Sequence, residues 1–537
     1  MNTLDFFASI VVLILTIICV YKNKKLIIYE NEILFAILLI LFCAIISCFA
    51  GVSLGDSLYG VGRIGMILVW LLFLMQCTSM QREQLLLVVP HIAAFMVWVS
   101  MSFLVFPPTH LLMVEENGRL LGFFSYANTA GLFLLLGWII LLMQNEKNTG
   151  KKSRYLRIAE LVTILLGMLW TGSRTTLIIA VIATIWLAIQ KKISFGSCLL
   201  GVVSTVICVL GYALITQDLS HARNLSTFWG RILYWKDALL LIRSHPLGLG
   251  YLGYFFSQES IQTGLYTTRF VHNEWLQSAL DYGWIACGVM VVVFAMQWKK
   301  NKGMNRWIIT IIACHCVMDM DLQFLLIDWI LITAMNISDG KKLEVKWQNS
   351  LIKSLLVLYV AVGGIAFGWL GIAQGLMYVG DYSLADALVP NRVETKEMLI
   401  LGAIDNNDVK EVRQESEELL KNNEMDVLAY DALTLVAEAE GDNIAMLQYK
   451  RQAVGLQPYN LEEYEDYVAR IDYVATLSEQ TENEAMYQEC VSMMKDVEQL
   501  LVTTEKKTSS LAYRLNDVPS FTMQDEYQKM MERYLFY

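Results

Sequence analysis

The chain has 537 residues, of which 56% are hydrophobic, and its formal net charge at pH 7 is −10. Its mean hydropathy of +0.46 excludes an ordinary soluble protein, and no segment is basic and aromatic enough to suggest binding of nucleic acid. We therefore expect an integral membrane protein with no nucleic-acid partner.

Apolar windows long enough to span a bilayer as helices, or nearly so, recur along residues 1–380. These windows lie near residues 5–21, 33–52, 61–77, 85–106, 124–144, 157–172, 175–190, 195–215, 275–298, 307–319, 322–336 and 354–375. We predict an all-α fold in which residues 1–380 form a polytopic domain of about twelve transmembrane helices. The first window has neither a basic flank nor a small-residue cleavage site, so we interpret it as a span and not as a signal peptide.

Two neighbouring windows, at 307–319 and 322–336, differ from the others because ionisable side chains interrupt them. These side chains are His315, Asp319, Asp321 and Asp328. Such residues at membrane depth are costly and are usually functional. This pair is therefore the weakest part of the predicted span pattern.

Lys and Arg are distributed unequally between the loops on the two sides of the membrane. One set of loops carries 19 of them, whereas the opposite short loops carry Arg63, Arg119 and Arg174 and little else. Because basic loops favour the cytoplasmic side, the first set is predicted to be cytoplasmic. Both ends of the chain and a long loop at residues 216–273 then face outward.

The first outward segment with candidate functional residues is GRLLGFFSYANTAG, at residues 118–131. Arg119 precedes an aromatic pair, and Asn128 opens the following helix. Both are candidates for substrate binding. An asparagine at the start of a helix also has a purely structural explanation, because its side chain caps free backbone N–H groups.

The next outward segment is WTGSRTTLIIA, at residues 170–180, where two spans turn on Gly172 and Ser173. Arg174 follows the turn at the outer interface. One interpretation is that Arg174 snorkels to lipid headgroups. The tightness of the turn and the scarcity of outward basic residues favour a functional arginine instead.

Residues 228–255 read FWGRILYWKDALLLIRSHPLGLGYLGYF and predict an amphipathic helix over 230–244 that ends at Pro246. Arg231 lies near the start of this helix and Arg243 near its end. Unpaired N–H groups at a helix start suit an anion, and an adjacent arginine can bind a phosphate through two N–H groups. The alternative is a helix that only lies on the membrane surface.

The last outward segment, RFVHNEWLQSALDYGW, begins with polar groups and leads into the apolar window at 275–298. It contributes Arg269, His272, Asn273 and Glu274 as candidates. A histidine with a pKa of about 6.5 is suited to act as a base at neutral pH. A lone histidine is also often a structural group, and this alternative stays open.

No metal or nucleotide motif accompanies these segments. The sequence contains no HExxH, no CxxC and no GxxxxGK[ST] loop. We therefore predict neither a metal site nor a cofactor.

The composition changes near residue 380. From Ser383 onward there are 31 Asp and Glu against 14 Lys and Arg, a net charge of −17. We predict a separate soluble helical domain at residues 381–537, outside the cytoplasm. An acidic balance of this kind usually means only a well-solvated surface.

This acidic region contains traces of a repeat. Pro390 and Pro458 lie 68 residues apart, twice the 34-residue period of tetratricopeptide repeats. Residues 429–460 resemble one such repeat, with a turn at Gly441 and Asp442. Stacked repeats form a concave surface for a protein partner; the alternative is a helical domain that only braces the membrane part.

Together the four outward segments resemble the O-antigen ligase and O-antigen polymerase superfamily. The similarity rests on GRLLGFFSYANTAG, GSRT, GRILYWKDALLLIRSHPLGLGYLGYF and HNEWLQSALDYGW in this order, and covers roughly residues 60–340. The resemblance implies a membrane glycosyltransferase of the GT-C type in the cytoplasmic membrane. Its donor would be a glycan on undecaprenyl diphosphate, and its acceptor a hydroxyl of a glycan, a lipid or a protein.

The resemblance also implies roles for individual residues. Arg174 and Arg231 would hold the diphosphate, and His272 would act near the acceptor hydroxyl. Transfer would need no metal ion, and attack opposite the diphosphate would invert the anomeric centre. The acidic repeat domain is not a general part of this family.

Two other functions remain possible from the sequence. A flippase or transporter of the same lipid would also span the membrane many times, but such proteins often contain duplicated halves, and the sequence has no recognisable duplication. A membrane-anchored scaffold built around the repeat domain would not need about twelve spans.

Overall fold

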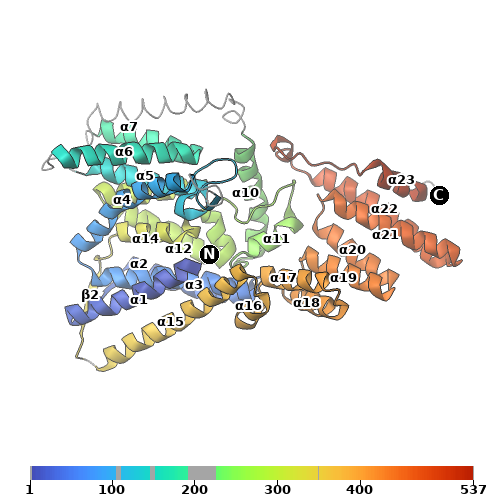
Figure 1. The fold of residues 1–537 in the computed structure, drawn as a ribbon, viewed down its shortest axis with the longest axis horizontal. Coiled ribbons are helices and arrows are strands. Elements are labelled where there is room, and N and C mark those ends of the chain that lie inside the picture. Colours follow the sequence, from blue (N-terminus) through green and yellow to red (C-terminus); the bar gives the residue numbers. More distant parts are fainter. Residues whose placement is uncertain (1–2, 105–110, 145–150, 191–224, 349, 536–537) are drawn as a thin grey trace.

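The computed structural model describes the chain except for residues 1–2, 105–110, 145–150, 191–224, 349 and 536–537. The described part is mainly helical and consists of a membrane bundle followed by a set of C-terminal helices. Figure 1 shows the two parts side by side along the longest axis of the molecule.

Eleven of the twelve predicted windows coincide with helices of the bundle, and the window at 195–215 lies outside the described residues. The helices are α1 (Thr3–Asn23), α2 (Glu32–Ala50), α3 (Leu54–Gln76), α4 (Ser79–Leu104), α5 (Ala127–Met143), α6 (Lys151–Thr171), α7 (Arg174–Ile189), α12 (Glu274–Lys300), α13 (Gly303–His315), α14 (Leu325–Ala334) and α15 (Ser350–Val379). Among the described residues, six of these are long and apolar enough to cross a membrane: α1, α2, α3, α4, α12 and α15. The chain is an all-α polytopic membrane protein.

Helix α5 forms the centre of one half of the bundle. Its residues from Thr129 to Leu142 are buried without a break, and α4, α6, α7 and α13 pack around it. A helix that is apolar on all sides must be enclosed by other helices. The first residues of α5 are thereby fixed at one end of the bundle.

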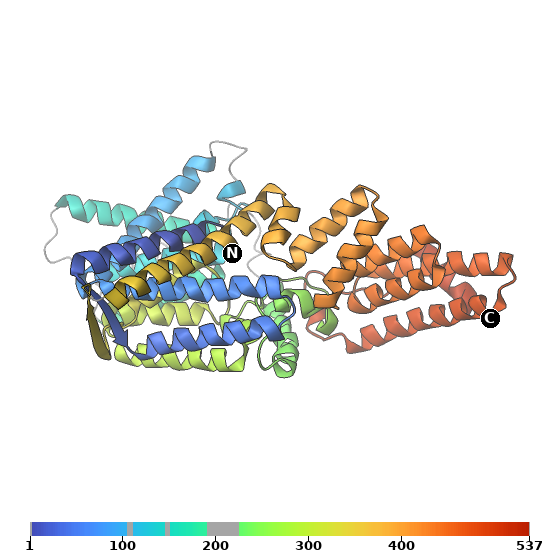
Figure 2. The same cartoon turned by 90° about the horizontal axis from the view of Figure 1, so that it is seen from below.

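The opposite end of the bundle carries a small antiparallel sheet. Strand β1 (Lys25–Glu30) pairs with β2 (Lys341–Lys346), with Lys25 opposite Lys346 and Glu30 opposite Lys341. Figure 2 shows the two strands at the end farthest from the C-terminal helices. The basic residues at 22–25 and at 341–346, which belong to the set of loops predicted to be cytoplasmic, therefore lie at one end of the bundle.

Helix α10 (Ser226–Ser244) and helix α11 (Gly253–Ile261) come from the predicted outer loop, whose residues 216–224 lie outside the described residues. In Figure 1, α10 stands across the end of the bundle, next to the C-terminal helices. The turn after α10 packs into a kink of α12 at Gly283, where φ is +86°. A side chain at Gly283 would lie 2.6 Å from the Pro246 carbonyl oxygen, so only glycine permits this contact.

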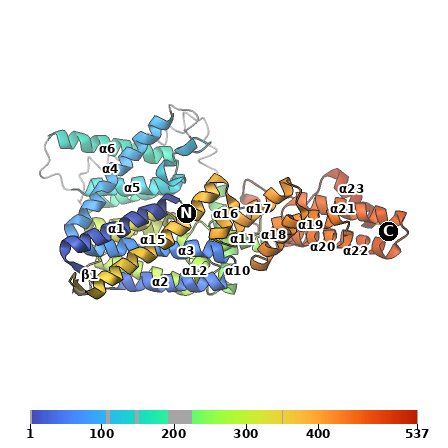
Figure 3. The ribbon, with the colours of Figure 1, turned by 60° about the horizontal axis from the view of Figure 1, so that its bottom comes forward.

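The C-terminal helices follow directly on α15. They are α16 (Tyr382–Leu388), α17 (Val393–Asp405), α18 (Val409–Asn422), α19 (Val427–Glu440), α20 (Asn443–Leu456), α21 (Leu461–Gln480), α22 (Glu484–Lys507) and α23 (Asp525–Leu535). Successive helices pack as hairpins that extend away from the bundle (Figure 3). The turn between α19 and α20 falls at Gly441 and Asp442, and Gly441 has a φ of +76°. The resemblance of these hairpins to tetratricopeptide repeats stays a prediction.

The C-terminal helices are joined to the bundle through buried charges. The Arg392 guanidinium lies 3.3 Å from the Asp56 carboxylate at the start of α3, and both side chains are buried. The same carboxylate accepts a hydrogen bond from the Val393 N–H at 3.0 Å. If one partner of such a buried pair were separated from the other, a buried charge would be left without compensation. Because this is costly, the junction is a fixed contact.

Candidate active site

A buried carboxylate, Asp319, is the meeting point of several side chains at the end of the bundle next to α10. It accepts hydrogen bonds from the Tyr126 hydroxyl at 2.7 Å and the Asn128 amide at 2.8 Å. Nη2 of Arg231 lies 3.1 Å away, and Nδ1 of His272 lies 3.3 Å away. Asp319 has no exposed surface, whereas the side chains of Arg231 and His272 are 14% and 19% exposed. Arg231 and His272 therefore form the accessible rim around the buried carboxylate.

His272 is held in place by the backbone around the start of α12. Its φ of +51° lies in the left-handed region, which non-glycine residues adopt rarely and at some cost. Asn273 caps α12 through the Leu276 N–H at 3.1 Å and donates to the Val317 carbonyl at 3.0 Å. These bonds join the start of α12 to the turn that carries Asp319, and this strain is typical of functional sites.

Arg231 reaches Asp319 from α10, which crosses the end of the bundle. The indole N–H of Trp235, one turn later, donates to the Val271 carbonyl at 3.1 Å. The Tyr234 ring lies 6.3 Å from the His272 ring, centre to centre. The contacts of α10 thus keep both Arg231 and His272 next to Asp319.

Arg119 and the turn before Arg174 border the same cluster. Arg119 donates from Nη2 to Asn128 at 2.8 Å and from Nε to the Thr171 carbonyl at 2.8 Å. A side chain at Gly172 would lie 3.4 Å from Arg119 Nε. Arg174 is the first residue of α7, directly after the capping residue Ser173, and it is exposed.

The comparison with family models identifies the central part of the chain. Residues 159–291 match the family described as O-antigen ligase. The chain carries an O-antigen ligase domain. Comparisons with curated proteins and with solved structures found no match. The domain points to a glycan-transferring membrane enzyme.

The O-antigen ligase domain contains Arg174, Arg231 and His272, the three residues predicted to be catalytic. Tyr126 and Asn128 precede it in the sequence, and Asp319 follows it. The cluster is therefore completed by residues on both sides of the matched stretch.

A second buried hydrogen-bond network joins His315, Asp321 and Thr129, outside the matched stretch, to Thr176 within it. Nδ1 of His315 lies 2.5 Å from the Asp321 carboxylate, which also accepts from Thr129 at 2.9 Å. Nε2 of His315 lies 3.1 Å from the Thr176 hydroxyl, which donates to Ser173 at 2.9 Å. This network connects the turn after α13 with the start of α7, where Arg174 lies.

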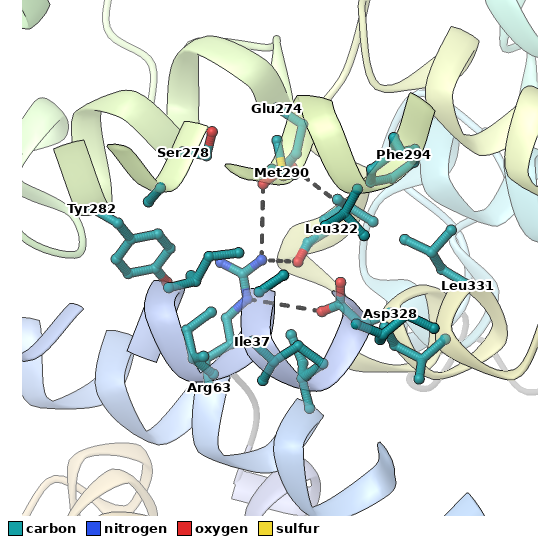
Figure 4. A pocket seen from close by; sticks show the side chains of 18 of the residues that line it. Ile37, Arg63, Glu274, Ser278, Tyr282, Met290, Phe294, Leu322, Asp328 and Leu331 are labelled. Atoms are coloured by element: carbon teal, nitrogen blue, oxygen red, sulfur yellow. Dashed lines mark hydrogen bonds and ion pairs between the residues drawn. The ribbon is translucent and has the colours of Figure 1, made fainter. Parts of the chain in front are cut away.

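Glu274 lines a cavity between α2, α3, α12 and α14. The cavity has a volume of about 100 Å³ and brings Glu274 together with Arg63 and Asp328 (Figure 4). Glu274 accepts from Gln323 at 2.9 Å, and Arg63 donates to the Leu322 carbonyl and to Gln323. This buried centre fixes α3 and α12 to the segment that follows Asp319.

Two other predicted substrate-binding residues lie outside the cluster. Arg269 forms an ion pair with Glu394 of α17 at 2.9 Å and is 47% exposed. Arg243 is an exposed residue in the last turn of α10. Twelve positions separate it from Arg231, which corresponds to about 18 Å along a helix.

Sequence reasoning missed Asp319 and Tyr126 as members of the site. Asp319 was visible as one of the ionisable residues that interrupt the window pair at 307–336. An ionisable residue in an apolar window is by itself a signal of function. Tyr126 gave no comparable signal, because a tyrosine at the boundary of a span is common.

Proposed function

We propose that the chain transfers a glycan from undecaprenyl diphosphate to an acceptor hydroxyl on the outer face of the cytoplasmic membrane. The observation that carries this proposal is the contact of Arg231 and His272 with the buried carboxylate of Asp319, at 3.1 and 3.3 Å. The O-antigen ligase domain supports the same class of reaction.

His272 acts as the base in this proposal. The Asp319 carboxylate accepts the N–H at Nδ1 of the imidazole, which leaves Nε2 unprotonated and able to take a proton. The partial exposure of the His272 side chain gives an acceptor hydroxyl access to Nε2. Asp319 then stabilises the imidazolium that forms.

Arg231 and Arg174 hold the diphosphate. A guanidinium has five N–H donors, and the contact with Asp319 is made through Nη2 of Arg231. Phosphate oxygens can be bound by donors on the rest of the group. Cations held beside the leaving diphosphate stabilise its negative charge without reorganising.

The reaction then balances as one substitution at the anomeric carbon. The acceptor oxygen forms a bond to this carbon as its proton passes to Nε2 of His272. The bond between the anomeric carbon and the diphosphate oxygen breaks, and its electron pair stays on the diphosphate. Attack from the opposite side inverts the anomeric configuration, and the two arginines take the place of a metal ion.

The position of the site supports an outward-facing reaction. The cluster lies at the end of the bundle next to the C-terminal helices, whereas strand β1 and the lysine-rich strand β2 lie at the other end (Figures 1 and 2). Under the positive-inside tendency, the site and the C-terminal domain face away from the cytoplasm. The C-terminal domain, with its predicted repeats, would help to select or hold the acceptor and would offer a surface for a protein partner.

The test is to measure donor binding and glycan transfer separately, with purified variants in lipid. Arg231→Lys should lower transfer by about a hundredfold, because an ammonium cannot reproduce a planar contact with two N–H groups. His272→Ala should lower transfer to a similar extent and leave donor binding nearly unchanged. Arg306→Lys is the matched control, because Arg306 lies in the first turn of α13 and contacts Asn301 and Trp298.

Normal transfer by Arg231→Lys, or loss of donor binding in His272→Ala, would show that these roles are wrong. Movement of the glycan-linked lipid across the vesicle membrane, without transfer of its glycan, would favour a transporter instead.

A further inference from the structure

Residues 508–516, which we call the clasp segment, connect the C-terminal helices with α10. The segment follows α22 and includes the short helix η4 (Ala512–Arg514). Its first residue, Thr508, lies within hydrogen-bond distance of the Tyr459 hydroxyl, at 3.1 Å. Beyond the segment, Gln524 donates to Glu465 of α21 through its backbone at 2.7 Å and its side chain at 2.9 Å. The clasp segment is therefore fixed to the C-terminal helices on both sides.

Polar contacts join the clasp segment to both halves of α10. The Asn516 N–H donates to the hydroxyl of Ser226, the first residue of α10, at 2.8 Å. Lys236, almost three turns later, donates to the Ser509 hydroxyl at 3.3 Å. The Ser509 N–H donates to the Thr263 carbonyl at 2.8 Å. The clasp segment thus spans the helix and reaches the loop behind it.

Apolar and aromatic contacts fill the space between these polar ones. Ala512 and Leu233 are fully buried against each other and Tyr266. The Arg514 guanidinium lies over the Trp229 ring, 4.5 Å from its centre. A cation in this position is attracted to the face of the indole ring.

The clasp segment and the candidate active site contact opposite faces of α10. Trp229, Leu233 and Lys236 follow one another at intervals of four and three residues, so they share one face of the helix. Arg231 and Trp235 project from the other face, toward Asp319 and the Val271 carbonyl. Helix α10 is therefore held between the clasp segment and the start of α12.

We propose that the clasp segment is a positioning element of the glycan-transfer site. It fixes the rotation of α10 about its own axis and the position of α10 along that axis. Arg231 therefore stays in contact with Asp319 and is ready to hold the diphosphate. The C-terminal domain thereby contributes to donor binding without touching the donor. This inference rests on the proposed role of Arg231 in binding the diphosphate.

The experiment uses the full chain in lipid nanodiscs and undecaprenyl diphosphate as the binding probe. Arg514→Ala removes the cation above Trp229 and should weaken donor binding by about fivefold. Arg514→Lys keeps a cation there and should recover most of that loss. Gln457→Ala is the matched control: Gln457 donates to Glu259 at 3.0 Å, so it also joins the C-terminal helices to the membrane part, but without contacting α10.

A double-mutant cycle separates positioning from general stability. If Arg514 acts through Arg231, then Arg514→Ala should weaken donor binding less than about twofold when Arg231 is already alanine, because coupled residues are not additive. Gln457→Ala should leave donor binding unchanged in both backgrounds. Equal losses from Arg514→Ala in the two backgrounds, no loss at all, or no recovery with Arg514→Lys would overturn the proposal.

The result for Arg231→Ala alone shows which idea has failed. If Arg231→Ala binds undecaprenyl diphosphate normally, both the proposed role of Arg231 and the inference built on it are wrong. If Arg231→Ala weakens binding and Arg514→Ala does not, only the clasp inference is wrong.

Discussion

Asp319 gives the candidate site its chemical character at the scale of single residues. The carboxylate is buried and contacts four polar side chains from three separate parts of the chain. A buried charge in this position is costly unless it is paired and hydrogen-bonded. The arrangement therefore fixes the positions of Arg231 and His272 as well as that of Asp319.

Replacing Asp319 with asparagine keeps the shape of the side chain and removes its charge. The amide cannot accept from all four partners, so His272 loses the group that orients its Nδ1–H. We expect Asp319→Asn to lower the rate of glycan transfer on the order of a hundredfold, measured with purified protein in lipid. Asp339→Asn, which removes an exposed carboxylate beside Lys300, is the control. Wild-type transfer by Asp319→Asn would contradict the assigned role.

At the scale of helices and turns, Gly283 is required for the close approach of α12 to the turn after α10. Alanine would combine an unfavourable φ of +86° with a Cβ 2.6 Å from the Pro246 oxygen. We expect Gly283→Ala to lower the free energy of unfolding by about 2 kcal/mol or more, measured by thermal unfolding in detergent. Gly288→Ala is the matched control, because a Cβ there meets no atom within 4 Å. Equal stability of the two variants would contradict this explanation.

The contact between α17 and the start of α19 contains two carboxyl groups that affect stability in a pH-dependent way. Burial, reinforced by nearby carboxylates, raises the pKa of Glu397 to about 8 and that of Asp426 to about 6. The folded state therefore favours the protonated forms. The protonated forms of Glu397 and Asp426 stabilise the folded state fully when the pH is below the ordinary pKa of a carboxyl group. This stabilisation is lost as the pH rises through the higher pKa values of the folded state.

Glu397→Gln should consequently stabilise the C-terminal helices at pH 8.5 and change little at pH 4. The expected gain is on the order of 1 kcal/mol or more, because each unit of pKa shift corresponds to about 1.4 kcal/mol. Thermal unfolding of the purified chain at both pH values measures it. Glu417→Gln alters an exposed carboxylate of α18 and serves as the control. A loss of stability at pH 8.5 would show that Glu397 is held as an anion.

The helices were more predictable than the contacts between them. The apolar windows identify the bundle because every span must present apolar side chains to lipid. Arg119, Asn128, Arg231 and His272 were recognised as candidates, and the structure brings them to one carboxylate, directly or through Asn128. Glu274 was also a candidate, but it forms a buried contact with Arg63 that depends on how α3 packs against α12. No pattern of residues near Glu274 in the sequence predicts such a contact between distant helices.

At the scale of the whole molecule, the C-terminal domain and the candidate site lie at the same end of the bundle. We predict that this end faces away from the cytoplasm. A reporter enzyme that is active only outside the cytoplasm, fused after Tyr537, should be active. The same reporter fused in the loop after Lys300, next to strand β2, should be silent and is the control. Activity of a cytoplasm-specific reporter after Tyr537 would overturn this orientation.

Helix α1 packs against α15, and the strand that follows α1 pairs with the strand that precedes α15. The ribosome makes α15 more than 300 residues after α1, an interval of about half a minute at ordinary rates of synthesis. During that time the inner face of α1, including Phe6 and Leu13, has no final neighbour in α15. Helix α1 therefore stays incompletely packed until α15 has been made, and a chain that stops before α15 leaves this face of α1 without its neighbour.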